Sequence, residues 1–401
     1  MNYPTIVLKL KRSESLRRRH PWVFSGAIDK ILLNEEEEDL QEGDLVEVVD
    51  SNEEPLGVGH FAEGSIAVRM ITFKKERIDE SFWEQKIRNA YNLRIELQLA
   101  NSEVTTCYRL IHAEGDGLPG LIIDIYDKVA IVQAHSLGFA NSLQHITTAI
   151  KTVMSDCISA VYSKSQKTLH QQSKTSIEDG YLYGNEQSPQ IVLENGLQFE
   201  IDWINGQKTG FFIDQRFNRE LLKTYSKGKK VLNTFCYSGG FSVYALAAGA
   251  SEVHSVDSSA KAIVLTDRNV EINFGKVKNH QSFAKDTLKF LNETEETYDT
   301  IILDPPAYAK SKSAQHKAVQ GYKRLNAKAF SMIKKGGILF TFSCSQVVDR
   351  KLFENTIMAA AIEARRNVRV LHHLSQPADH PVSIFHPEGE YLKGLVLYIE
   401  E

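Results

Sequence analysis

Residues 231–249 read VLNTFCYSGGFSVYALAAG, and this stretch decides the fold of the chain. A short apolar run at 230–233 leads into the turn Tyr237-Ser238-Gly239-Gly240, and the alanine-rich segment Ser242–Ala248 has the composition of a helix. The pattern predicts a strand, a tight glycine turn and a helix. Glycines in such a turn let a ligand approach the backbone closely, and the helix offers its N-terminal amides to an electron-rich group.

Two further apolar runs end in acidic residues. Glu252–Val256 is followed by Asp257, and Tyr298–Leu303 is followed by Asp304-Pro305-Pro306. In nucleotide-binding βαβ units, an acidic residue at the tip of the second strand accepts hydrogen bonds from ribose hydroxyls. A glycine turn also occurs in βα units that bind nothing, but three strand-end signals in register favour a cofactor site.

The C-terminal half, residues 201–401, alternates strands with helices. The pattern predicts helices at Ala260–Asn273, Ala314–Lys334 and Asp349–Arg366, the second of them closed by Gly336-Gly337. It predicts strands at Ile338–Phe342, Val368–Leu374 and Leu395–Ile399. This alternation indicates an α/β domain with a doubly wound sheet, whose ligands bind at the carboxyl ends of the strands.

The N-terminal half predicts two smaller domains. Residues 1–75 contain short strands separated by turn residues, including GDLVEVVD at 43–50 and GVGHF at 57–61, which indicate a small β-rich module. Residues 76–200 combine a helical pattern near Asp79–Leu99 with a hairpin made of Leu121–Tyr126 and Val129–Ala134. These residues predict a small α+β domain.

A basic and aromatic stretch lies near the N-terminus. Arg17, Arg18 and Arg19 precede Trp22 and Phe24. Arginines beside aromatic rings are suited to phosphate contact and base stacking, which is how many RNA-binding surfaces are built. The alternative is a solvated basic turn over a buried tryptophan, and this stretch by itself does not separate the two.

The segment QKTGFFIDQRFNR, at 207–219, stands just upstream of the central strand. It combines glycines, paired aromatic residues and a polar cluster, so we expect a lid over the cofactor. The alternative is a plain connection from a strand to a helix in which Asp214 is the N-cap.

Composition limits the classes of protein that the chain can belong to. The chain has 401 residues, 42% hydrophobic residues and a formal net charge of −4, which suit a protein of two or three domains whose basic surface is local. It shows no apolar run of membrane-spanning length and no secretory signal, so we expect a cytoplasmic protein without a membrane partner. The four cysteines form no CxxC pair, which argues against a zinc cluster or a disulfide framework.

A glycine-rich turn carries His112, Glu114 and Asp116. These residue types also ligate metals, but in such a turn we expect solvated or capping groups. No metal site is predicted.

Two strand ends carry reactive side chains. Asp304-Pro305-Pro306 and Ser343-Cys344-Ser345 each follow a predicted strand, so both project toward the predicted crevice. An isolated cysteine after a buried strand is usually a small core residue. The two flanking serines and the acidic loop opposite favour a functional thiol at Cys344.

Several motifs together resemble a known family. They are the segment at 207–219, VLNTFCYSGGFSVYAL at 231–246, VDSSAKAI at 256–263, DTIILDPPAYAKSK at 299–312, GGILFTFSCS at 336–345, DHPV at 379–382 and EYLKGL at 390–395. The C-terminal half resembles a class I (Rossmann-like) methyltransferase that uses S-adenosylmethionine, and residues 1–75 resemble a PUA domain, a barrel found on many RNA-modifying enzymes. The whole chain resembles the RlmI family of ribosomal RNA large-subunit (cytosine-5-)-methyltransferases.

The resemblance implies a role for each matching residue. Cys344 would be the nucleophile and Asp304 the acid at the reaction centre, while Arg17, Arg18, Arg19 and Trp22 would contact ribosomal RNA. A homodimer is implied as well. The residues implied to bind S-adenosylmethionine are Phe212, Gln215, Asn233, Phe235, Tyr237, Gly239, Asp257, Ser258, Asp286 and Asp304.

The implied chemistry explains why a thiol and an acid are needed together. Carbon-5 of cytosine is a poor nucleophile, so a thiolate must first add to carbon-6. Two alternatives remain: methylation of a base nitrogen, which D/N-P-P loops also serve and which needs no thiol, and a non-catalytic RNA-binding protein on a methyltransferase fold.

Overall fold

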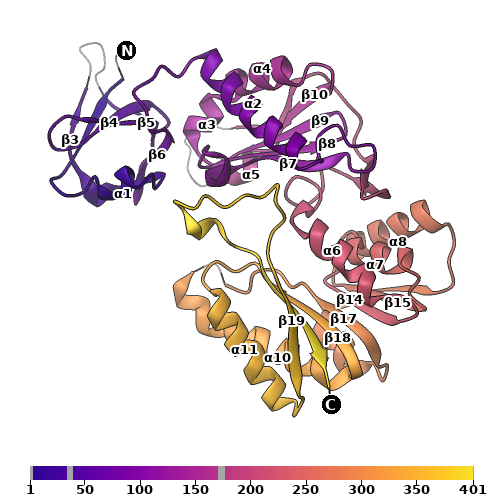
Figure 1. The fold of residues 1–401 in the computed structure, drawn as a ribbon. Coiled ribbons are helices and arrows are strands. Elements are labelled where there is room, and N and C mark those ends of the chain that lie inside the picture. Colours follow the sequence, from indigo (N-terminus) through magenta and orange to yellow (C-terminus); the bar gives the residue numbers. More distant parts are fainter. Residues whose placement is uncertain (1–2, 34–38, 170–176, 310, 401) are drawn as a thin grey trace. The chain divides into compact units, whose positions relative to one another are not determined.

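The computed structural model describes residues 3–33, 39–169, 177–309 and 311–400 (Figure 1). The chain divides into two compact units. Unit 1 contains Met1–Val192, Ile201–Ile213 and Ala378–Gly389. Unit 2 contains Leu193–Glu200, Asp214–Pro377 and Glu390–Glu401. A late segment of the chain therefore belongs to the N-terminal unit, and the division into three consecutive domains stays a prediction.

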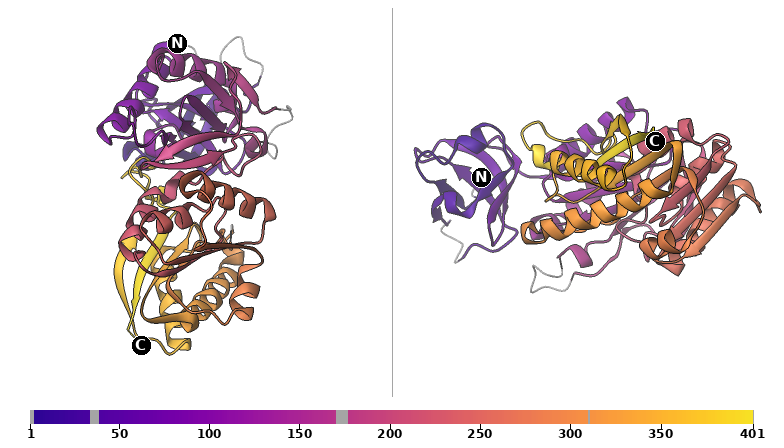
Figure 2. Two further views of the ribbon diagram at one scale, coloured as in Figure 1. Left: turned by 90° about the vertical axis from the view of Figure 1, so that its right-hand side faces the viewer. Right: turned by 90° about the horizontal axis from the view of Figure 1, so that it is seen from below.

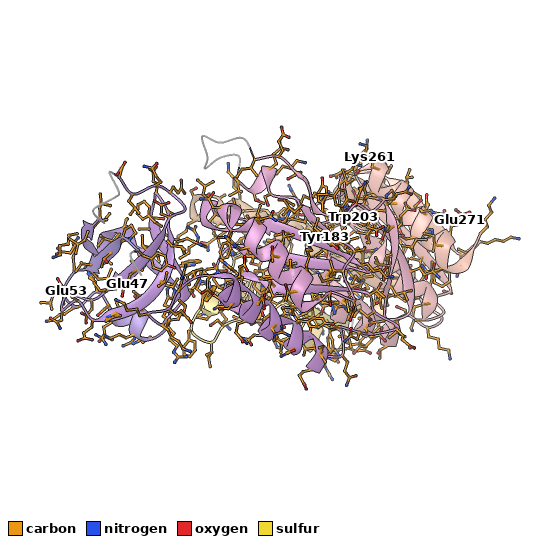
Figure 3. The ribbon with its side chains drawn as sticks, turned by 90° about the horizontal axis from the view of Figure 1, so that it is seen from above. Glu47, Glu53, Tyr183, Trp203, Lys261 and Glu271 are labelled. Atoms are coloured by element: carbon orange, nitrogen blue, oxygen red, sulfur yellow. The ribbon has the colours of Figure 1, made fainter. Side chains whose placement is uncertain are left out.

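Unit 1 begins with a six-stranded sheet in the order β2-β6-β5-β4-β1-β3. Its elements are β1 (Thr5–Leu8), α1 (Glu14–Arg17), β2 (Trp22–Phe24), β3 (Ile28–Leu32), β4 (Leu45–Val49), β5 (Pro55–Phe61) and β6 (Ile66–Thr72). The alternating apolar residues of these strands, such as Ile6, Val46 and Val68, form one buried core. Glu47 on β4 pairs with Lys75 at 2.8 Å, and Glu53 lies in the turn between β4 and β5 (Figure 3).

The second sheet of unit 1 has five strands in the order β11-β10-β9-β8-β7. Its elements are α2 (Glu80–Glu96), β7 (Cys107–His112), β8 (Leu121–Tyr126), β9 (Val129–Ala134), α3 (Leu137–Asn141), α4 (Leu143–Val153), β10 (Ala160–Ser163), α5 (Gln166–Leu169) and β11 (Gly180–Tyr183). The predicted hairpin is confirmed, because Leu121 pairs with Ala134 and Tyr126 with Val129. β12 (Gln190–Glu194) and β13 (Leu197–Ile201) form a separate pair.

The turn after β7 differs in part from its prediction. Asp116 forms a buried ion pair with Arg94 of α2 at 2.6 Å, and Glu114 accepts a hydrogen bond from the indole N–H of Trp22 at 3.1 Å. Asp116 also accepts a hydrogen bond from the backbone N–H of His112 at 2.6 Å, so it caps the turn as expected. Both acidic side chains are nevertheless structural partners of other segments and not solvated groups. The prediction missed this because the partners lie in other segments of the chain, so no local pattern reveals them.

Unit 2 is built on a seven-stranded sheet in the order β16-β15-β14-β17-β18-β20-β19, in which β20 is antiparallel to both neighbours. Its strands are β14 (Lys230–Thr234), β15 (Glu252–Asp257), β16 (His280–Ala284), β17 (Tyr298–Leu303), β18 (Ile333–Ser343), β19 (Val368–Leu374) and β20 (Lys393–Ile399). Its helices are α6 (Arg216–Leu222), α7 (Gly240–Ala247), α8 (Ala260–Phe274), α9 (Thr287–Glu293), α10 (Gln315–Met332) and α11 (Arg350–Glu363). The predicted doubly wound α/β sheet is confirmed.

Helices cover both faces of this sheet (Figures 1 and 2). Val231 of β14 packs in a core with Phe241 of α7, whereas the next residue, Leu232, packs in a core with Leu325 of α10. Successive side chains of a strand point to opposite faces, so a central parallel strand must be apolar on both. This requirement explains the unbroken apolar runs of the sequence.

One predicted helix end is wrong. The helix expected at 314–334 ends at Met332, and Gly336 and Gly337 lie inside β18. A Cβ on Gly337 would stand 2.8 Å from the carbonyl oxygen of Lys334, and Gly336 has φ +77°. The glycine pair therefore permits an irregularity within the strand and does not cap the helix. Among the helices of the described ranges, none is long and apolar enough to cross a membrane.

Candidate active site

The turn between β14 and α7 is held in a strained conformation. Phe235, Tyr237 and Gly239 have φ values of 54°, 46° and 74°, which lie in the left-handed region that non-glycine residues rarely adopt. A Cβ on Gly239 would approach the Cγ2 of Thr266 to 2.7 Å. Strain of this kind persists only where the surroundings hold it, and it concentrates at ligand sites.

Asp257, at the end of β15, holds that turn. Its Oδ2 accepts a hydrogen bond from the backbone N–H of Tyr237 at 3.0 Å, and its Oδ1 accepts one from Ser259 at 2.9 Å. Ser258 is exposed beside it. Asp286, after β16, is also exposed and caps α9 by accepting a bond from the Lys289 N–H at 2.9 Å. Three successive strand ends of the sheet thus present polar groups at the same edge.

Asn233, a further predicted cofactor residue, lies within β14. It is buried, and its amide nitrogen donates to the hydroxyl of Ser242 at 2.9 Å. Its amide oxygen is buried with no hydrogen-bond partner in the described part of the chain. A buried acceptor without a donor is unfavourable unless a ligand supplies one. The residues present therefore fit a ligand that carries an N–H donor, such as the amino group of S-adenosylmethionine.

Asp304 follows β17 and accepts a hydrogen bond from the side-chain amide of Gln215 at 3.0 Å. Desolvation by burial, and then the negative charge of Asp214, raise the pKa of Asp304 to about 7, although the Gln215 bond and Arg219 oppose the shift. At neutral pH a large fraction of this carboxyl group is therefore protonated. A protonated carboxyl can donate a proton or a hydrogen bond, as a general acid must.

Asp214 is a functional candidate that the sequence did not single out. Its Oδ2 accepts a hydrogen bond from the hydroxyl of Tyr391 at 2.7 Å, and its Oδ1 is buried without a partner among the described residues. The alternative interpretation, in which Asp214 is an N-cap, is wrong. Helix α6 begins after Gln215, and no side-chain cap bond is formed there. Its place in the polar cluster at 207–219 was the available signal.

Cys344 stands directly after β18, half-buried between two fully buried serines. The hydroxyl of Ser345 donates to the carbonyl oxygen of Ala309 at 2.7 Å, which ties the Cys344 loop to the loop that carries Asp304. Desolvation, and then the charges of Asp304 and Asp214, raise the pKa of the Cys344 thiol to about 11. The thiol is thus protonated at neutral pH until a base takes its proton.

Lys393 is a second residue that sequence reasoning missed. It lies on β20 opposite Ser343, it is 3% exposed, and its ammonium group donates to the carbonyl oxygen of Ser345 at 2.8 Å. Its positive charge acts against the rise of the Cys344 pKa. A lysine inside the otherwise apolar segment 392–399 was the signal that would have found it.

A buried ion pair packs against the glycine turn at Gly240. Arg219 of α6 donates two hydrogen bonds to Glu194, at 2.8 and 2.7 Å, and both residues are buried. The hydroxyl of Tyr244 also donates to Glu194, at 3.0 Å. A Cβ on Gly240 would approach the Cδ of Arg219 to 2.9 Å, so only glycine lets the arginine pack this closely under the turn.

The structure places the predicted site residues in two groups. Unit 2 holds Cys344 and every predicted cofactor residue except Phe212, which is half-buried near the end of a unit 1 segment. The predicted RNA contacts also belong to unit 1. Arg17 pairs with Asp50 at 2.5 Å and Arg18 with Glu14 at 3.4 Å. Trp22 is partly buried, whereas Arg19 lies over the ring of Phe385 at 5.9 Å.

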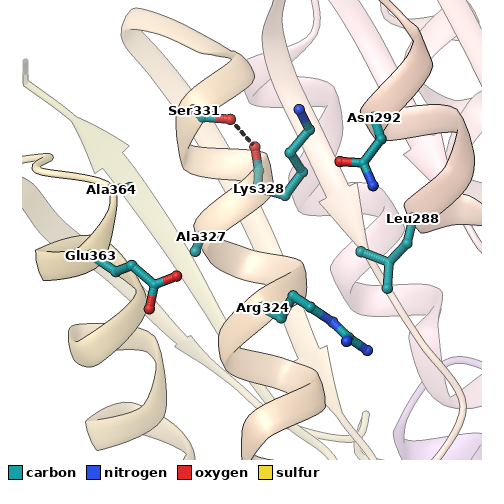
Figure 4. Close-up of a pocket in the computed structure, with 8 residues that line it drawn as sticks. All are labelled: Leu288, Asn292, Arg324, Ala327, Lys328, Ser331, Glu363 and Ala364. Carbon is teal, nitrogen blue, oxygen red and sulfur yellow. Dashed lines mark hydrogen bonds between the residues drawn. The ribbon is translucent and has the colours of Figure 1, made fainter.

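A hollow of about 550 Å³ lies elsewhere in unit 2, between α9, α10 and α11 (Figure 4). Its lining includes Leu288, Arg324 and Glu363, and the hydroxyl of Ser331 donates to the carbonyl oxygen of Lys328 at 2.7 Å. Its lining residues come from these helices and not from the strand ends, and none of the predicted site residues lines it. The strand-end residues and not this hollow therefore form the candidate site.

Comparisons with known proteins agree with this geometry. A family model described as S-adenosylmethionine-dependent methyltransferase matches residues 108–384, and a PUA-like domain model matches residues 6–73. The protein SMU.776, solved in complex with SAH, has the same fold, with a TM-score of 0.84 at 22% identity over 98% of this chain and 99% of that chain. A chain from Streptococcus mutans has a TM-score of 0.83 at the same identity and coverage.

Curated relatives match over nearly the whole chain. Ribosomal RNA large subunit methyltransferase I of Aeromonas hydrophila is 38% identical over 98% of both chains. The protein of the same name from Photobacterium profundum is 39% identical over 99% of both chains. Identity at this level over the full length, together with a strained glycine turn, acidic strand ends and a strand-end thiol, leads to one conclusion. The chain belongs to the ribosomal RNA large subunit methyltransferase I family of S-adenosylmethionine-dependent methyltransferases.

Proposed function

We propose that this methyltransferase transfers a methyl group to carbon-5 of a cytosine in large-subunit ribosomal RNA, in the cytoplasm. The names of the relatives support the RNA substrate. One observation carries the choice of atom: the Ser345–Ala309 hydrogen bond joins the loop of a half-buried thiol to the loop of a carboxyl group whose pKa is about 7. Methylation of carbon-5 needs both groups, whereas methylation of a nitrogen needs no thiol.

The cofactor site follows from the strand ends of unit 2. Asn233 would accept a hydrogen bond from the amino group of S-adenosylmethionine, Asp257 would hold the ribose hydroxyls, and Asp286 would lie near the adenine. The exposed carboxylate of Asp286, the position of Asp257 at the end of β15 and the unpartnered oxygen of Asn233 support these roles. When bound, the cofactor supplies an electrophilic methyl group on a sulfonium sulfur.

The protein supplies the nucleophile and the proton transfers. Cys344 loses its proton to the carboxylate form of Asp304, which its pKa of about 7 makes available at neutral pH, and its thiolate forms a bond to carbon-6 of the cytosine. Electron density moves through the ring to nitrogen-3, where Asp304, now protonated, donates that proton. Lys393 favours the thiolate, because its buried positive charge partly offsets the negative charges of the two aspartates.

The adduct must then be resolved. Carbon-5 would form a bond to the methyl group of the bound cofactor, which would leave as a neutral thioether. The carbon-5 proton is then lost to a carboxylate, and the nitrogen-3 proton returns to Asp304 as the bond between Cys344 and carbon-6 breaks. We assign that carboxylate to Asp214, since its buried Oδ1 has no partner in the described ranges and its charge acts on both Asp304 and Cys344. A base stacked in a helix cannot reach these groups, so the target cytosine must be flipped out.

The test is to identify the product. The protein is incubated with ribosomal RNA and labelled S-adenosylmethionine. The RNA is digested to nucleosides, which are separated by liquid chromatography against standards of each methylated isomer and identified by mass spectrometry. We expect 5-methylcytidine from the wild type and none from Cys344→Ala. The matched control is Cys157→Ala, because Cys157 lies in unit 1 and contacts Tyr91 and Asn101. A methyl group on a base nitrogen, formed equally well by Cys344→Ala, contradicts the proposal.

A further inference from the structure

The segment Ala378–Gly389 belongs to unit 1, although it comes late in the chain (yellow in Figure 1). Asp379 is fully buried, and its carbonyl oxygen accepts a hydrogen bond from Arg94 at 2.7 Å. Its carboxylate accepts one from the backbone N–H of Arg109 at 3.0 Å. A Cβ on Gly115 would come within 1.9 Å of the carbonyl oxygen of Pro381. Buried contacts therefore fix the position of this segment within unit 1.

In this position, the segment supplies one side of a pocket of about 360 Å³. Arg19, Lys74 and Lys86 line it together with Phe385 and Glu114. The Phe385 ring is 47% exposed, and the guanidinium group of Arg19 lies 5.9 Å from its centroid. The volume is within the range of small-ligand sites, about 300 to 1,000 Å³.

The charges of this pocket are unbalanced. Three cations face one carboxylate, and Glu114 is already engaged by the indole N–H of Trp22. Burial, and also the charge of Lys74, lower the pKa of Lys86, although Glu76 opposes the shift. The chain as a whole has a net charge of −4, so this concentration of cations is local. An anion would relieve the repulsion between the two lysines.

An aromatic ring beside converging cations is the composition of a single-stranded RNA site, in which cations contact phosphate and the ring stacks on a base. We propose that the pocket lined by Arg19, Lys74, Lys86 and Phe385 binds one unpaired nucleotide of the RNA substrate outside the active site. The identity of the RNA rests on the proposed function; the binding chemistry does not. The C-terminal segment thus contributes to RNA recognition through Phe385.

The test measures binding of the full chain to a fluorescein-labelled single-stranded RNA by anisotropy, over a range of salt concentrations. Phe385→Ala should weaken binding by about 5-fold to 100-fold without changing the salt dependence, since base stacking is removed. Phe385→Tyr keeps the ring and should bind like the wild type. Lys74→Gln and Lys86→Gln together should reduce the slope of log K against log salt, by about 0.7 for each phosphate that the protein no longer neutralises.

A matched control removes a charge elsewhere in unit 1. Lys30 on β3 does not line the pocket and stands 4.0 Å from Glu53, so Lys30→Gln should leave binding unchanged. Thermal melting confirms that each variant is folded. The proposal is overturned if Phe385→Ala and the double lysine variant bind as the wild type does, or if a blunt duplex of the same sequence binds equally well.

Failure of the two proposals can be told apart. If the variants lose RNA binding but the wild type makes no 5-methylcytidine, the pocket stands and the proposed function fails. If the wild type makes 5-methylcytidine and the variants bind RNA normally, the proposed function stands and the pocket fails.

Discussion

At the scale of single residues, the active site keeps two titratable groups away from the water that would otherwise stabilise their charges. Burial raises the pKa of Asp304 to about 7 and that of Cys344 to about 11. Both shifts favour the protonated forms. The site thus holds its protons before the substrate arrives, and a buried lysine is the group that partly offsets this tendency for the thiol.

Removing that lysine should make the thiol less reactive. Lys393→Gln is expected to raise the pKa of Cys344 further, because it removes the positive charge of Lys393, which favours the thiolate. The measurement is the rate of iodoacetamide alkylation of the Cys344 peptide against pH, followed by mass spectrometry. Lys393→Arg keeps the charge and should keep the profile. An unchanged profile in Lys393→Gln would show that the lysine is only structural.

Asp304→Asn should stabilise the fold at alkaline pH and abolish methyl transfer. The folded pKa of Asp304 lies above its ordinary value of 3.8, so the stability that its protonated form contributes is lost as the pH rises toward 7. The neutral amide avoids that loss, which is at most about 4 kcal/mol. Urea unfolding at about pH 4 and pH 8 measures it. Equal stability of both proteins at the higher pH would refute the expectation.

At the scale of elements, the glycine turn depends on the helix beneath it. Glu194→Gln leaves Arg219 as a buried charge without its carboxylate, so unfolding free energy should fall by about 3 to 5 kcal/mol. The matched control is Glu200→Gln, which breaks a half-exposed pair with Arg268 at 3.2 Å and should change stability by less than about 1 kcal/mol. Chemical denaturation compares them. If both variants lost the same unfolding free energy, burial would not make the Glu194 pair more important for stability than the Glu200 pair.

At the scale of the whole molecule, the chain returns to its N-terminal unit after building most of unit 2. Arg94→Met removes both the ion pair with Asp116 and the bond to Asp379, so residues 378–389 should exchange amide hydrogens faster. RNA affinity should fall with it, while titrated S-adenosylmethionine still binds. Arg88→Met changes an exposed residue of the same helix and serves as the control. Unaltered exchange in 378–389 would contradict the anchoring role.

The sequence by itself determined the α/β class and most strand ends of unit 2. Central parallel strands must be apolar on both faces, and their ends carry the polar groups, so Asp257, Asp304 and Cys344 stand out in a linear reading. The hairpin of β8 and β9 was predictable for a similar reason, because its pairing is local. The glycine pair at 336–337 was not, since its role depends on contact with a neighbouring strand.

Only the tertiary structure decided which distant side chains meet. Lys393 donates to the carbonyl oxygen of Ser345 beside Cys344, Arg219 pairs with Glu194, and Asp379 accepts a bond from Arg109. Buried charges need such partners, and each partner comes from a segment far away in the chain. Local propensity and periodicity carry no information about such pairs. The sequence therefore identified the reactive atoms, and the fold supplied the electrostatic environment that sets their pKa values.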